Sequence, residues 1–307
     1  LAQAIAKQIS LIYLGLTVTC MLVYLMLGMS LFDAMVHSMT TIATGGFANY
    51  DASFGVFTGP TEYAATLFMV LAALPFVRYV QLLNGQSEPL LCDSQIRVFL
   101  ITLGLLVLIS AFALYQQASH QPEGALRAAL FNVTSIMSGT GYASADYMHW
   151  GGFLVMIFFF AGMIGGCAGS TACSVKIFRY QLLFASIRVQ VQRIRSPNGI
   201  FVPRFEGRAI GPDVLNSVIS FFMLFVVTMG IISWALALTG LDFVTAVSGA
   251  ATALANVGPG LGDTIGPAGN FSSLNDAAKW ILSAAMLIGR LELTAVYALL
   301  TLRFWRA

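Results

Sequence analysis

Six long runs of apolar residues alternate with shorter, more polar stretches along this chain of 307 residues. Each run is close in length to the roughly 20 apolar residues that one helical span needs to cross a lipid bilayer. We therefore predict six transmembrane helices. They occupy residues 9–29, 63–83, 98–115, 151–166, 214–238 and 277–302.

Three of the stretches between these runs are too short and too polar to cross a bilayer, yet too apolar for ordinary loops. They align without gaps when Gly46, Gly141 and Gly258 are placed in register. Upstream of that glycine they share an alanine at −12 (Ala34, Ala129, Ala246), a hydroxyl at −6 (Thr40, Ser135, Thr252), a large apolar residue at −4 (Ile42, Met137, Leu254) and a small residue at −3 (Ala43, Ser138, Ala255). This agreement indicates a repeat of span, short helix, glycine-ended loop and span, present three times.

Loops of this kind are expected to surround a cavity or a buried site. Non-helical backbone at membrane depth is tolerated only where it is buried in protein or lines a water-filled cavity. Glycine permits the positive φ that turns successive carbonyl groups toward one axis, where they replace the hydration shell of an alkali cation. The short helices, expected at residues 32–41, 125–134 and 243–253, would point their negative C-terminal ends at the same axis. The repeat therefore predicts a pore for a cation.

The kind of cation follows from the residues of the glycine-ended loops. Segments 42–46, 137–141 and 254–258 contain no Asp or Glu. Calcium and magnesium are usually bound through carboxylates, so a cage of carbonyl groups favours a monovalent ion. The alternative is that the three stretches are helix hairpins that end in a capping glycine. A cap would explain neither the shared upstream register nor the depth of the loops.

Composition and charge place the chain in a membrane and give it an orientation. Hydrophobic residues make up 58% of the sequence and charged residues only 9%, which is too little polar surface for a soluble protein. The basic residues are concentrated on one side of the predicted spans, which the positive-inside rule makes the cytoplasm, with both termini inside. That side holds Lys7, Arg78, Arg97, Lys176, Arg179, Arg188, Arg193, Arg195, Arg204, Arg208, Arg303 and Arg306, and the other holds Arg127 and Lys279. Because these residues flank membrane spans, we expect no binding of nucleic acid.

The sequence offers little for catalysis or for a bound cofactor. The four cysteines form no CxxC pair, so we expect neither a disulfide nor a structural metal. No cluster of His, Asp, Glu or Cys falls at membrane depth, which argues against a membrane-embedded enzyme.

Four segments carry a resemblance to a known family. They are HSMTTIATGGFANYDASFG at 37–55, GGCAGSTACSVK at 165–176, NVGPGLG at 256–262 and SLNDAAKWILSAAMLIGRLE at 273–292. The chain resembles the TrkH-type potassium uptake proteins of the Trk/Ktr/HKT superfamily over almost its whole length. The resemblance implies an all-α integral membrane fold of linked potassium-channel units around a central pore in the bacterial inner membrane. It also implies a homodimer, potassium as substrate, and a cytoplasmic TrkA-like partner that binds the regulatory nucleotide.

The resemblance assigns the glycine-ended loops to a selectivity filter. The matching filter residues are Ile42, Ala43, Thr44, Gly45 and Gly46; Met137, Ser138, Gly139, Thr140 and Gly141; and Leu254, Ala255, Asn256, Val257 and Gly258. The family's first repeat has no counterpart, so we expect the sequence to be a fragment that lacks it. The three repeats would then occupy residues 1–84, 85–187 and 213–307, with a basic cytoplasmic loop at 188–212.

The resemblance also assigns a gate. A break in the fourth span at Gly165, Gly166, Cys167, Ala168, Gly169, Ser170 and Thr171 matches an intramembrane gate loop, although Ala172, Cys173 and Ser174 stand where members often carry glycines. The alternative is helix packing, since Gly162 with Gly166 and Gly165 with Gly169 fit the GxxxG pattern.

Arg290 lies within the sixth predicted span, where a charge is costly and must face the interior. Its match to a family arginine implies a place in the permeation path below the filter, in contact with the gate loop. A buried pair with Glu292 is the alternative, but residues two apart on a helix do not face each other. For the basic segment Arg188–Arg208, docking of a TrkA-like regulator and anchoring to anionic membrane lipid remain equally open.

Potassium uptake through a gated pore is therefore the predicted function. The alternative is a secondary transporter, a sodium- or proton-coupled symporter built on broken helices. That alternative needs paired discontinuous spans in inverted repeats. Here the repeats share one orientation, and we expect a single interrupted span.

Overall fold

The computed structural model describes residues 2–117, 121–291, 293–299, 301 and 304–306, and most of the described chain is helical. The strands found in this part of the chain are two residues each and pair into one antiparallel hairpin. The all-α architecture predicted from the sequence is confirmed. The α-helices are α1 (Ala2–Met26), α2 (Leu31–Ile42), α3 (Pro60–Ala72), α4 (Phe76–Leu83), α5 (Glu88–Cys92), α6 (Ser94–Gln116), α7 (Pro122–Ser138), α8 (Gly152–Met163), α9 (Ile177–Arg195), α10 (Pro212–Leu238), α11 (Phe243–Ala255), α12 (Asp276–Arg290) and α13 (Leu293–Leu299); the strands are β1 (Arg204–Phe205) and β2 (Arg208–Ala209); and the 3-10 turns are Ser53–Val56, Tyr147–Trp150, Phe271–Ser273 and Phe304–Arg306.

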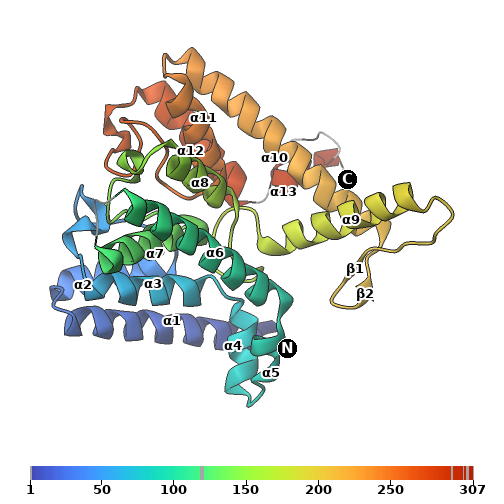
Figure 1. The fold of residues 1–307 in the computed structure, drawn as a ribbon, viewed down its shortest axis with the longest axis horizontal. Coiled ribbons are helices and arrows are strands. Elements are labelled where there is room, and N and C mark those ends of the chain that lie inside the picture. Colours follow the sequence, from blue (N-terminus) through green and yellow to red (C-terminus); the bar gives the residue numbers. More distant parts are fainter. Residues whose placement is uncertain (1, 118–120, 292, 300, 302–303, 307) are drawn as a thin grey trace.

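Three similar units follow one another along the chain (Figure 1). Each has a long outer helix, a shorter helix that runs back into the molecule, and a returning helix. The units are α1–α2–α3, α6–α7–α8 and α10–α11–α12, and within each unit the outer and the short helix pack closely together. The short helix α7 also packs on α3 of the preceding unit, and α11 packs on α8, so the units are joined through their short helices.

The buried core is mostly apolar but includes polar side chains of the short helices, and apolar residues cover the outside. The short helices bury Asp33, Asn132 and Thr245, among other polar side chains. The outer helices instead expose large apolar side chains such as Ile101 on α6 and Trp234 on α10, at 70% and 69% exposure. This arrangement suits a molecule whose outer surface meets lipid and whose interior meets a polar solute.

The prediction of six spans, of which only the fourth is interrupted, is partly wrong. Three helices of the described chain are long and apolar enough to cross a membrane: Ile5–Met26, Ser94–Gln116 and Pro212–Leu238. The second predicted span bends by 88° between α3 and α4, and the sixth bends by 105° between α12 and α13. The fourth contains only the 12-residue helix α8.

The bend in the second span has a local cause. Pro75 lacks a backbone N–H and disfavours helical geometry at Leu74, so α3 ends at Ala72 and a new helix begins at Phe76. The helix α4 continues into α5, and together they project from the end of the molecule at which the N-terminus lies (Figure 1). The C-terminus, α9 and the β1–β2 hairpin lie toward the same end.

A buried ion pair joins the first two units. Arg127 of α7 lies 2.7 Å from the Glu62 carboxylate in the first turn of α3, whose side chain is only 5% exposed. The same carboxylate accepts a hydrogen bond from the N–H of Gly59. Glu62 thus caps its own helix and ties it to the neighbouring unit.

We expect Arg127→Gln to lower the free energy of unfolding by about 3 kcal/mol, because it leaves the buried Glu62 carboxylate without its cation. Thermal denaturation of the purified protein in detergent measures the change. Lys279→Gln is the matched control, since its pair with Asp276 is exposed and 3.8 Å long, and such pairs contribute about 0–1 kcal/mol. Equal effects of the two substitutions would contradict the assigned role of the buried pair.

Candidate functional site

Each short helix ends in a segment with the same unusual backbone. The residue two before the aligned glycine has positive φ in all three segments: 50° at Thr44, 75° at Gly139 and 55° at Asn256. The aligned glycine is also positive, with φ of 63° at Gly46, 82° at Gly141 and 116° at Gly258. The residue between them is not positive in any segment. Such alternation turns successive carbonyl groups to the same side of the strand, whereas a simple helix cap needs only the first positive φ.

The three glycines lie together. A Cβ added to Gly46 would collide with the carbonyl oxygen of Thr140, and one added to Gly141 would collide with the carbonyl oxygen of Val257. A Cβ on Gly258 would lie 3.8 Å from the Cα of Gly141. All three glycines line one cavity at the mouth of the segments. The structure therefore brings the three predicted filter segments side by side around a shared space.

The hydroxyl at −6, which the sequence alignment singled out, holds each segment in place. The Thr40 hydroxyl donates to the carbonyl of Phe47 at 3.0 Å, and the Ser135 hydroxyl donates to the carbonyl of Tyr142 at 2.7 Å. The Thr252 hydroxyl accepts from the N–H of Gly258 at 3.0 Å. In each repeat the backbone carbonyl of the same residue also accepts an N–H from the segment. The shared hydroxyl thus anchors the loop to its own short helix.

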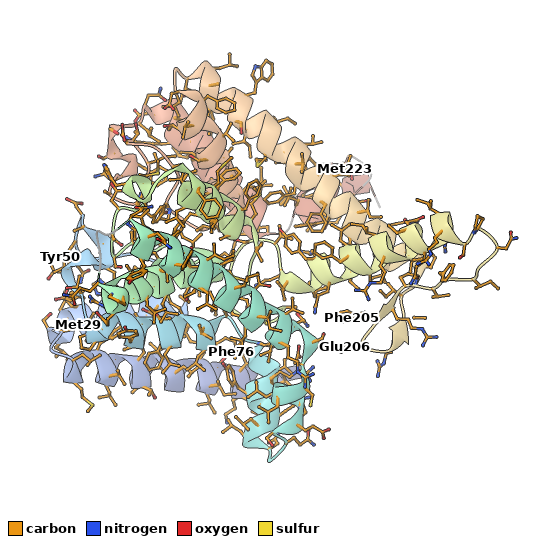
Figure 2. All side chains as sticks on the ribbon, in the orientation of Figure 1. Met29, Tyr50, Phe76, Phe205, Glu206 and Met223 are labelled. Carbon is orange, nitrogen blue, oxygen red and sulfur yellow. The ribbon has the colours of Figure 1, made fainter. Side chains whose placement is uncertain are left out.

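The first turn of α2 anchors the segment that follows the first filter glycine. The Asp33 carboxylate accepts hydrogen bonds from the Asn49 amide, the Ser30 hydroxyl and the Tyr50 hydroxyl. The Asn49 bond is the main reason that the pKa of Asp33 lies below its usual value, followed by the Ser30 bond. Tyr50 lies at the end of the molecule opposite the hairpin that carries Glu206 (Figure 2). The mouth of the cavity is at that end, since Tyr50 is one of its lining residues.

Residues 164–176, which we call the intramembrane loop, lie against the other end of the filter segments. The Thr171 hydroxyl donates to the carbonyl of Ile42 at 2.9 Å. The N–H of Cys173 donates to the carbonyl of Ser138 at 3.3 Å, and the N–H of Ser174 donates to the carbonyl of Ala255 at 2.8 Å. The loop therefore contacts the inner end of all three filter segments.

The seven predicted gate residues all fall within this loop, but they do not all contact the filter. Gly165 packs against the backbone of Cys173, and Gly166 packs against Ala73 and Ala172. The alternative of a GxxxG helix contact is wrong, because α8 ends at Met163. The Ser170 hydroxyl donates to the carbonyl of Cys167 within the loop. Three residues bind partners outside the loop: the N–H of Cys167 donates to the Ala73 carbonyl, the N–H of Ala168 donates to the Gln95 side chain, and the Gly169 carbonyl accepts from the N–H of Phe76. Among the described hydrogen bonds, Thr171 is the one residue of the seven that binds a filter segment.

Arg290 is the last residue of α12 rather than the middle of a continuous span, and this part of the prediction is wrong. Its Nη1 lies 2.9 Å from the Sγ of Cys173 in the intramembrane loop. Gly289, directly before it, allows α12 to approach the carbonyl of Leu254 closely. Arg290 lines a second cavity, below the filter, together with residues 170–176 of the loop. Glu292, the alternative partner of Arg290, lies outside the described residues.

Several residues of this region were missed by sequence reasoning. Cys173 and Ser174 were noted only as departures from a glycine run, yet they bind two filter segments. Lys176 was counted only among the basic residues of the cytoplasmic side, yet its ammonium group donates to the Ala172 carbonyl inside the loop. Gln95 carried no motif. Its role depends on two segments 73 residues apart, which no local pattern reveals.

The chain is similar to one protein family over nearly its whole length. The family model described as "TrkH: Cation transport protein" matches residues 3–303. Among curated proteins, the Trk system potassium uptake protein TrkI of Halomonas elongata is 45% identical over 98% of the chain, and the Trk system potassium uptake protein TrkH of Escherichia coli is 35% identical over 98%.

A solved structure has the same fold. The crystal structure of the potassium transporter TrkH from Vibrio parahaemolyticus matches with a TM-score of 0.92 and 33% sequence identity. The match covers 98% of this chain and 64% of that chain. The chain likewise spans 62% of the length of the two curated relatives named above.

We expect Gly141→Ala to destabilise the protein by about 1–3 kcal/mol, because a side chain there meets the Val257 carbonyl and requires a positive φ. The melting temperature in detergent measures this effect. Gly104→Ala is the control. It lies in the helix α6 with nothing within 4 Å of the added Cβ, so it should be neutral or stabilising by about 0.5–1 kcal/mol. A destabilised Gly104→Ala with an unchanged Gly141→Ala would refute the packing described here.

Proposed function

The chain belongs to the TrkH family of cation transport proteins, and we propose that, as part of a complete transporter, it conducts potassium ions across the bacterial inner membrane. The observation that carries this proposal is the meeting of three glycine segments around one cavity. Each segment alternates backbone handedness and lacks a carboxylate. Carbonyl oxygens arranged in this way replace the hydration shell of a monovalent cation.

The filter residues are those of the three segments 42–46, 137–141 and 254–258. The printed names of the curated relatives, potassium uptake proteins, support potassium as the substrate. No resident cofactor is needed for this chemistry, because backbone groups supply the ligands. The ion is the cargo. The relatives are transport proteins, and the chain is not an enzyme.

We further propose that the intramembrane loop is the gate. It fills the space under the filter and its N–H groups bind carbonyl oxygens at the filter's inner end. Arg290 adds a positive charge to the cavity directly below, beside the loop. A cation leaving the filter therefore meets both a physical obstruction and an electrostatic barrier. Opening requires the loop to move and the arginine to move with it.

Orientation and partners remain proposals drawn from charge and from the family resemblance. The termini, α9 and the basic β1–β2 hairpin lie toward one end of the molecule, which we assign to the cytoplasm. We propose that this end binds a TrkA-like regulator that carries the nucleotide, that the protein forms a homodimer, and that membrane lipid covers the outer helices. Anchoring of the segment Arg188–Arg208 to anionic lipid explains its charge equally well.

One observation favours the symporter alternative and another argues against it. Two further broken helix pairs are present, at α3–α4 and α12–α13, as that alternative requires. The three units nevertheless run in the same direction through the molecule (Figure 1), whereas broken-helix symporters place their site between inverted repeats. The pore remains the better-supported function.

Selectivity is tested at the filter. Gly46→Ser places a side chain against the Thr140 carbonyl, so we expect the ratio of rubidium to sodium flux to fall about tenfold, the effect of about 1.4 kcal/mol of lost coordination. The measurement is tracer flux in proteoliposomes that contain the full-length protein. Gly104→Ser, on an open helix surface, should leave the ratio unchanged. An unchanged ratio in Gly46→Ser would count against the filter assignment.

The gate is tested at Arg290. We expect Arg290→Ala to raise rubidium flux, because it removes the positive charge below the filter and the contact with Cys173. Arg290→Lys keeps the charge and should stay closer to the unsubstituted protein. Both variants are compared by tracer flux at equal protein density. If Arg290→Ala conducts no faster than the unsubstituted protein, the proposed gate is incorrect.

A further inference from the structure

The first turn of α6, residues Asp93, Ser94 and Gln95, contacts four separate parts of the molecule. Its position between the cytoplasm-facing elements and the intramembrane loop is not explained by the packing of α6 itself. The helix belongs to the second unit and its remaining residues face α7 and the outer surface.

Gln95 binds the intramembrane loop. Its Oε1 accepts a hydrogen bond from the N–H of Ala168 at 3.0 Å. On the next residue of the loop, the carbonyl of Gly169 accepts from the N–H of Phe76, the first residue of α4, at 3.0 Å. Two successive residues of the loop are therefore held by the elements that flank α5.

Asp93 joins the two elements that flank α5, helix α4 and the start of α6. Its carboxylate caps α6 through the N–H of Gln95 at 2.8 Å. The same carboxylate also lies 2.7 Å from both Nε and Nη2 of Arg78 in α4, as an ion pair. The Asp93 side chain is 2% exposed and the Arg78 side chain 28%, so the carboxylate of this two-point pair is buried. Asp93 thus ties helix α4 to the start of α6.

Ser94 reaches toward the other side, to elements of the proposed cytoplasmic surface. Its hydroxyl donates to the Glu206 carboxylate at 2.8 Å, and Glu206 lies in the turn of the β1–β2 hairpin (Figure 2). Its backbone carbonyl accepts from the side chain of Gln181 in α9 at 3.1 Å. Glu206 is exposed, so a molecule that binds the hairpin can act on it directly.

We propose that this turn is a joint that couples the β1–β2 hairpin and α4 to the intramembrane loop, with Gln95 as the residue that positions the loop. The inference rests on the proposed function, since it assumes that the loop is a gate. Without Gln95 the N–H of Ala168 would lose its partner inside the protein, and an unsatisfied backbone group is costly there. The closed position of the loop therefore depends on where the first turn of α6 lies. A partner that pulls Glu206 moves that turn and releases the loop.

The test uses the full-length protein in proteoliposomes, with Cys173 as the only thiol. Two quantities are measured: rubidium flux, and the rate at which a maleimide applied from the cytoplasmic side adds to Cys173. Cys173 is 7% exposed and lines the cavity below the filter, so its labelling reports release of the loop. A residue that only supports folding would change neither quantity at equal protein density.

Gln95→Leu removes the acceptor for Ala168, and we expect both flux and labelling to rise about fivefold, the effect of one lost hydrogen bond on a two-state equilibrium. Gln95→Glu keeps an acceptor oxygen and should remain near the unsubstituted values. Arg97→Gln is the matched control, because Arg97 is exposed on the same turn and binds the Leu91 carbonyl rather than the loop. It should change neither quantity.

A second variant tests the connection to the hairpin and does not disturb the interior. Glu206→Ala should raise labelling of Cys173, and this increase should disappear in the Gln95→Leu background, because both act through one path. Additive effects of the two substitutions on labelling would contradict the proposed joint. So would unchanged flux and labelling in Gln95→Leu when Arg290→Ala does raise flux. If Arg290→Ala itself has no effect, it is the proposed gate that fails.

Discussion

The structure depends on one constraint: a backbone N–H or carbonyl that lies at membrane depth outside a helix needs a partner within the protein or an ion in its place. The filter segments leave their short helices after Ile42, Ser138 and Ala255, and the intramembrane loop is also non-helical, so each supplies partners for the other. Hydroxyl groups on the short helices hold the outer part of each segment. The Thr171 hydroxyl and the N–H groups of Cys173 and Ser174 bind one inner carbonyl group in each segment. Under the proposed function, the carbonyl groups between these two sets are the ones available to a cation while the loop is seated.

The same constraint explains the distribution of polar residues. In a soluble protein the short helices would be amphipathic and their polar faces would meet water. Here their polar side chains are buried, because they face irregular backbone that has no other donor or acceptor. The outer helices carry the apolar surface. These outer helices bury few polar side chains, because their backbone N–H and carbonyl groups are paired within the helix itself.

Sequence alone could predict the features that repeat, and it missed those that depend on distant contacts. The register of Thr40, Ser135 and Thr252 was visible, because all three copies keep a hydroxyl for the same backbone bond. The positions of the three short helices also followed from that register. The bend at Pro75 was readable from proline geometry but was hidden by the apolar run around it. The link from Gln95 to Ala168 left no signal, because a single glutamine near a helix start has many explanations.

The carbonyl oxygens of Ser138 and Ala255 are occupied by N–H groups of the intramembrane loop. Under the proposed function, a cation at that depth and the seated loop are competing ligands for the same oxygens, so each must lower the affinity of the other by the same factor. Filling of the innermost position from the cytoplasm would then favour an unseated loop, and the permeating ion would act as an effector of its own passage.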